Sequence, residues 1–74
     1  MSRLIRMDQT GHTELAHWSP GDSESADAAR ATLRAELERG YFAVVSEPDG
    51  RATAVRDLPL DADLVILRRP IAGG

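Results

Sequence analysis

Cysteine, lysine and asparagine are all missing from this 74-residue sequence, which has only one Trp, one Tyr and one Phe. Without cysteine the chain can form neither a disulfide nor a thiolate metal site, which excludes the disulfide-stapled secreted scaffolds. No apolar run approaches the roughly 20 residues that a membrane-spanning helix needs, and no signal-type segment follows the first residue. We therefore expect one small soluble domain in the reducing cytoplasm, with no membrane partner.

Basic charge comes entirely from nine arginines, which twelve acidic residues outweigh to give a net charge of −3. The longest basic run is the pair Arg68-Arg69. A chain with this balance does not attract the phosphate backbone of a nucleic acid over long range. We therefore expect no nucleic-acid partner.

The remaining pattern predicts two hairpin-like units with one helix between them. Turn-forming residues at 8–11 and 47–50 each separate two short runs that are rich in apolar residues. The predicted strands cover residues 3–7, 12–18, 41–46, 51–56 and 64–68, and the predicted helix covers residues 24–39. An α+β fold with a mixed sheet of four or five strands and one packed helix is the economical way to bury these elements.

The helix has clear start, face and stop signals. Ser23 or Ser25 is expected to cap its first turn, and Gly40 stands where a glycine commonly ends a helix. Four apolar residues recur at spacings of three, four and four, which places them on one helical face. They are Ala26, Ala29, Leu33 and Leu37.

The last strand is apolar on both of its faces. Leu64 and Ile66 lie on one side, and Val65 and Leu67 lie on the other, because side chains alternate along a strand. One helix covers only one face of a sheet, so the second pair is either covered by other elements or contacts a partner. The sequence leaves open which pair faces outward.

With these elements in place, the chain resembles the β-grasp proteins of the ubiquitin-like superfamily over nearly its whole length. Thr10-Gly11-His12-Thr13 is similar to the first turn of ubiquitin, and residues 64–68 followed by Gly73-Gly74 are similar to its last strand and diglycine. Residues 70–74 also resemble the tails of the sulfur carriers of molybdopterin and thiamine synthesis. The chain departs from ubiquitin in its short connection before the last strand and in its lack of lysine.

The resemblance implies a monomeric β-grasp domain over residues 1–69, with the first and last strands adjacent and parallel, and a flexible C-terminal diglycine tail over residues 70–74. It implies a bacterial ubiquitin-like protein modifier. An adenylating enzyme would use ATP to activate Gly74, with Gly73 beside it, and a conjugating enzyme would pass the chain to protein targets. The chain itself would need no cofactor. Four residues are the expected partner-docking positions: Leu64, Ile66, Arg68 and Arg69.

A physical argument supports the same tail. Beyond Pro70 the largest side chain is Ile71 and the last two residues have none, so the segment can pass through a narrow channel. Five extended residues reach about 16–18 Å, which is long enough to enter another protein's active site.

Two alternatives remain open at this point. The first is a sulfur carrier whose Gly74 becomes a thiocarboxylate, and the second is a β-grasp binding module that is never conjugated. The residues favour neither an enzyme nor a metal protein. No serine has the context of a nucleophile, and His12 and His17 are five residues apart, which would place them on opposite faces of a strand.

Overall fold

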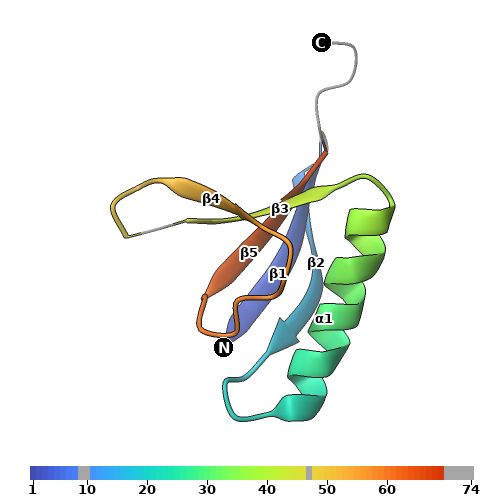
Figure 1. Cartoon of the computed structure of the whole chain (residues 1–74), viewed down its shortest axis with the longest axis vertical. Coiled ribbons are helices and arrows are strands. Elements are labelled where there is room, and N and C mark those ends of the chain that lie inside the picture. The colour runs from blue at the N-terminus through green and yellow to red at the C-terminus, as the bar shows by residue number, and fades with distance from the viewer. Residues whose placement is uncertain (9–10, 47, 70–74) are drawn as a thin grey trace.

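The computed structural model describes residues 1–8, 11–46 and 48–69. Its elements are β1 (Ser2–Asp8), β2 (Gly11–Trp18), α1 (Ser23–Glu38), β3 (Phe42–Ser46), β4 (Ala52–Val55) and β5 (Leu64–Arg68) (Figure 1). The strands form one sheet in the order β2-β1-β5-β3-β4. β1 and β5 are parallel, and the other three neighbouring pairs are antiparallel. The fold is therefore α+β of the β-grasp type, as predicted.

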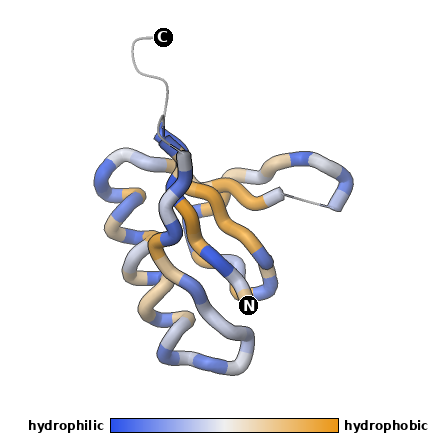
Figure 2. Tube along the Cα trace, turned by 180° about the vertical axis from the view of Figure 1, so that it is seen from behind, coloured by the Kyte–Doolittle hydropathy of each residue, from blue (hydrophilic) through white to orange (hydrophobic). Residues whose placement is uncertain are grey.

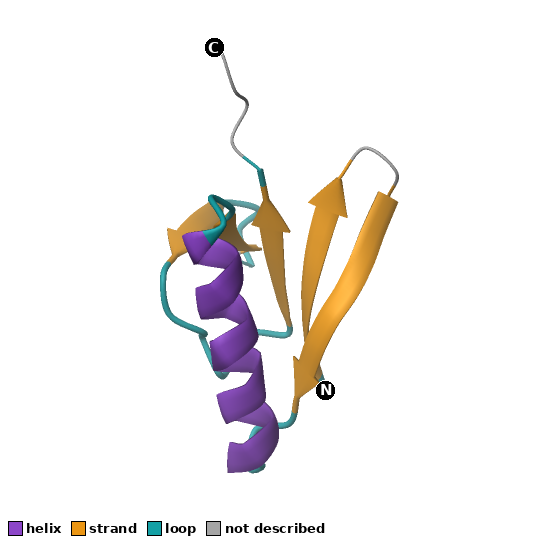
Figure 3. Ribbon diagram, turned by 90° about the vertical axis from the view of Figure 1, so that its right-hand side faces the viewer, coloured by secondary structure: helices purple, strands orange, loops and turns teal. Residues whose placement is uncertain are grey.

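The core lies between α1 and one face of the sheet (Figure 3). Its largest fully buried side chains are those of Leu4, Trp18, Leu33, Val65 and Leu67. Figure 2 shows that the most hydrophobic stretches follow the strands at the centre of the sheet. Val65 and Leu67 thus face the helix, and Leu64 and Ile66 face the other way, which settles the alternative that the sequence left open.

Asp22 caps the helix, so the prediction of Ser23 or Ser25 was wrong. The Asp22 carboxylate accepts hydrogen bonds from the backbone N–H groups of Glu24, at 3.2 Å, and Ser25, at 3.4 Å. A carboxylate at this position also interacts favourably with the positive end of the helix dipole. The Ser25 hydroxyl instead donates to the Asp22 carbonyl and accepts from the Ser19 N–H. At the other end Gly40 has φ of +100°, as a helix-terminating glycine requires.

The buried face of α1 differs from the predicted one at a single position. Ala26, Ala29 and Leu33 are buried as expected, but the fourth buried residue is Glu36, and Leu37 is only half-buried. At 3.6 residues per turn both positions lie close to the core side of the helix. Leu37 was predicted because it continues the apolar spacing of the helix, whereas Glu36, as a charged residue, is buried only because it has partners.

A β-bulge in β2 overturns the placement of the two histidines. The pairing register shifts between Leu4, which faces Ala16, and Ile5, which faces Glu14. The extra residue in β2 is Leu15. Because of it, His12 lies opposite Met7 and His17 lies opposite Arg3, on one face of the sheet rather than on two.

The shared face does not make the histidines a metal site. They are five positions apart along the strand, which is about 16 Å. Within residues 1–8, 11–46 and 48–69 no group of three or more His, Asp or Glu side chains could hold an ion.

The connection from β4 to β5 contributes to the core, which the sequence did not indicate. Leu58 is buried among the core residues. The Leu60 carbonyl accepts a hydrogen bond of 3.2 Å from the indole Nε1 of Trp18, and the Asp63 carbonyl accepts one of 3.0 Å from the N–H of Arg3. The loop therefore closes the end of the core and leads the chain into β5.

Candidate functional site

The face of the sheet opposite α1 carries an apolar row that no described helix covers. The strand registers align Ile5, Ile66, Val44 and Ala54 across β1, β5, β3 and β4. Ile5 is buried among its neighbours, Ile66 and Val44 are half-buried, and Phe42, two residues before Val44 on β3, is 38% exposed. We call this surface, made of Ile5, Phe42, Val44, Leu64 and Ile66, the open sheet face.

The four predicted docking residues do not form one patch. Leu64 and Ile66 lie on the open sheet face, and the exposed Arg68 follows on the same side, opposite Phe42 in the register. Arg69 instead lies over the ring of Tyr41, with its Cζ atom 5.9 Å from the ring centroid. Gly73 and Gly74 lie outside the described residues, as do Pro70 and the rest of the predicted tail.

Three guanidinium groups gather around Tyr41, near the ends of α1 and β5. The Cζ atoms of Arg6, Arg39 and Arg69 are 5.6, 6.0 and 5.9 Å from the ring centroid, within the range of cation–π attraction. The carboxylate of Glu36 accepts a hydrogen bond from Arg6 at 2.9 Å and one from Arg39 at 3.3 Å. We call these five residues the Tyr41 cluster. Three positive charges and one negative charge leave it positive.

The backbone of the link after α1 and of β1 positions the side chains of the Tyr41 cluster. The N–H of Tyr41 donates to the Glu36 carbonyl at 3.1 Å, so the short link after α1 holds the ring beside the last helical turn. Arg6 reaches the same place from β1, where it pairs with the buried Leu67 and so projects toward the helix. An arginine on the core side of a strand needs an acidic partner, and Glu36 is that partner.

This arrangement explains why Glu36 is buried and predicts a cost for neutralising it. We expect Glu36→Gln to lower the free energy of unfolding by about 1–2 kcal/mol, because Arg6 and Arg39 lose the negative charge between them. Chemical denaturation measures the change. Glu38→Gln, an exposed neighbour in the same turn, is the matched control and should change stability by less than about 0.5 kcal/mol. Equal effects of the two variants would contradict the assigned role of Glu36.

Comparison of the chain with protein-family models, curated proteins and solved structures finds no match. In the part of the chain that the structure describes, no helix is long and apolar enough to cross a membrane. A proposal about function therefore depends on the fold and on the residues named above.

Proposed function

We propose that this chain is a ubiquitin-like protein modifier that is conjugated to target proteins through its C-terminal glycine. The observation that carries the proposal is the sheet order, with β1 and β5 parallel neighbours at the centre and one helix packed on one face. The sequence reaches Gly73-Gly74 within a few residues of the end of β5.

In the proposed reaction an adenylating enzyme joins the Gly74 carboxylate to the α-phosphate of ATP, and pyrophosphate leaves. A nucleophile then attacks the acyl carbon and AMP leaves. After transfer through a conjugating enzyme, the final nucleophile is an amine of the target, which loses a proton to solvent as the amide forms. This chain supplies the carboxylate and the surfaces that enzymes recognise, while ATP and the catalytic groups belong to its partners.

The charges near the end of β5 support docking on an acidic enzyme groove. Arg68 is exposed on the open sheet face, and Arg69 belongs to the positive Tyr41 cluster. No acidic residue follows Asp63 in the sequence. Complementary charges of this kind raise association rates and make binding sensitive to salt.

Recovery of the protein from its native host under denaturing conditions tests the proposal. An N-terminal affinity tag leaves Gly74 free, and we expect a fraction of the tagged protein at masses above that of the free chain. Trypsin does not cut before proline, so digestion should cleave after Arg68 and leave residues 69–74 attached to an amine of each target.

Two other results would overturn the proposal. A C-terminus in which sulfur replaces one oxygen, with no larger species, would identify a sulfur carrier. The unmodified mass alone, under every growth condition, would leave a binding module that is never conjugated.

A further inference from the structure

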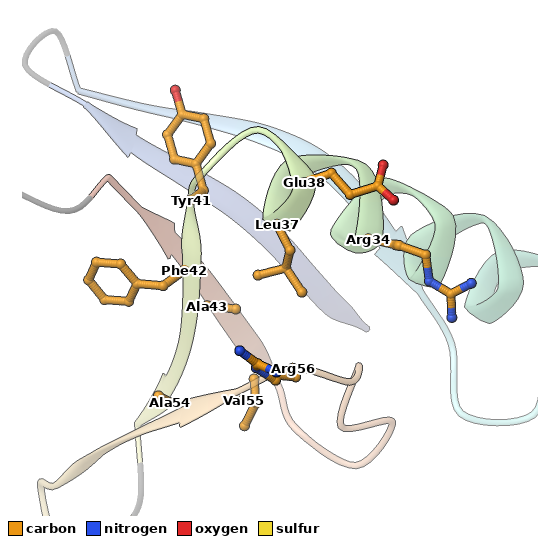
Figure 4. A pocket seen from close by; sticks show the side chains of 9 residues that line it. All are labelled: Arg34, Leu37, Glu38, Tyr41, Phe42, Ala43, Ala54, Val55 and Arg56. Atoms are coloured by element: carbon orange, nitrogen blue, oxygen red, sulfur yellow. The ribbon is translucent and has the colours of Figure 1, made fainter.

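A groove of about 630 Å³ separates the C-terminal half of α1 from the β3–β4 hairpin. Leu37 projects into it from the helix, and Ala43 and Val55 line it from the two strands (Figure 4). Ala43 is fully buried, and Leu37 and Val55 are half-buried. The groove therefore has an apolar floor that reaches the core from the surface.

The width of the sheet explains why this groove exists. Five strands at a spacing of about 4.8 Å place the outermost strand axes about 19 Å apart, whereas a helix with its side chains is about 10–12 Å across. The single described helix packs mainly against β2 and contacts β3 less, so it covers the side of the sheet away from β4. The uncovered strip, on the side of β4, is therefore about 7–9 Å wide, which is close to the 8–10 Å that separates the axes of two packed helices.

Arginines stand on both sides of this strip. Arg34 projects from α1, and Arg56 follows directly after β4. Neither guanidinium pairs with a carboxylate among the described residues, whereas four other arginines, Arg6, Arg30, Arg39 and Arg51, do. Among the residues that the structure describes, Glu38 is the one acidic residue that lines the groove, so the two arginines leave it positive.

We propose that this groove binds an amphipathic helix of a partner protein, one with an apolar face and acidic residues along both edges. The apolar face covers the half-buried Leu37 and Val55, which flank the buried Ala43, and the acidic edges meet Arg34 and Arg56. Helices that lie in apolar grooves are a common mode of recognition, and the width of the uncovered strip fits one. The site does not depend on Gly74, so it operates whether or not the chain is conjugated.

Two synthetic helices provide the probes. Each is a stapled peptide of about 14 residues, or about 21 Å of helix, with leucines on one face. One carries glutamates along both edges of that face and the other carries lysines. We expect only the acidic peptide to bind the native protein, with NMR shift changes centred on residues 34–43 and 54–56.

A charge swap tests the contacts. The double variant Arg34→Glu with Arg56→Glu should bind the acidic peptide about tenfold or more weakly, because two attractive contacts become repulsive, and it should gain affinity for the basic peptide. The matched control is Arg3→Glu with Arg51→Glu, which makes the same change in net charge away from the groove and should leave both affinities unchanged.

Several results would overturn the proposal. The first two are equal binding of both peptides to the native protein, and a loss of acidic-peptide binding in the control variant as large as in the groove variant. The other two are NMR shift changes that map to Ile66 and Val44, and no shift changes with either peptide at millimolar concentration.

Discussion

Deletion of Gly74 is expected to abolish formation of the acyl adenylate while the folded domain stays intact. In the proposed reaction the carboxylate must reach the ATP bound to the partner enzyme, at a fixed distance from the surfaces that dock. Removal of one extended residue withdraws the carboxylate by about 3.3–3.6 Å. A misplacement of about 1 Å can already cost about a hundredfold in rate, so the loss should be close to complete.

Replacement of Gly74 by tryptophan should have the same effect, because a channel that accepts the backbone of glycine excludes an indole. ATP–pyrophosphate exchange with the adenylating enzyme of the same organism measures the step. Gly21→Ala is the matched control, because Gly21 lies in a loop far from Gly74 in the sequence. A Cβ atom at position 21 would meet nothing within 4 Å, and the φ of Gly21 is not positive. Exchange by the deletion variant at the native rate would exclude activation at Gly74.

Replacement of Leu67 by alanine is expected to unfold much of the protein. Leu67 is fully buried, at the centre of the sheet between Arg6 on β1 and Ala43 on β3. Truncation of a buried leucine costs about 2–5 kcal/mol, from the lost transfer of apolar surface and from the cavity left behind. A domain of this length has a total stability of about 4–11 kcal/mol, so one substitution removes a large part of it.

Urea denaturation followed by the fluorescence of Trp18 measures this effect, since the indole is fully buried. Leu60→Ala removes the same atoms from a side chain that is 38% exposed, and its backbone bond to Trp18 is unaffected. We expect this control to cost less than about 1.5 kcal/mol. Similar midpoints for the two variants would show that Leu67 does not occupy a packed position in solution.

Features that depend on nearby residues were predictable from the sequence. The period of apolar residues placed the helix within one residue of Ser23–Glu38, and the glycine at position 40 ended it. The turn residues before Arg51 placed the second hairpin, although Glu47 lies outside the described residues. These signals act over a few residues, so reading along the chain recovers them.

Features that depend on contacts across the fold were not predictable in the same way. Glu36 is buried because Arg6, 30 positions earlier, reaches it across the core. The bulge beside Ile5 appears only when β1 and β2 are paired.

The candidate docking surface was likewise predictable in part, from nearby residues but not from contacts across the fold. Alternation along β5 placed Leu64 and Ile66 on a shared face, but the position of α1 was needed to show that this face is uncovered. Alternation also sends Arg68 and Arg69 to opposite sides, although their adjacent positive charges had favoured a single docking pair.

The bulge in β2 helps to prevent two copies of this molecule from pairing edge to edge. β2 and β4 are the two outer strands of the sheet, and the free backbone edge of an outer strand is a template for aggregation. The bulge interrupts the regular spacing of hydrogen-bonding groups along β2, and β4 is only four residues long, with an arginine on either side at Arg51 and Arg56. Both edges are therefore poor templates for an added strand, and we expect other proteins to approach this molecule through its faces.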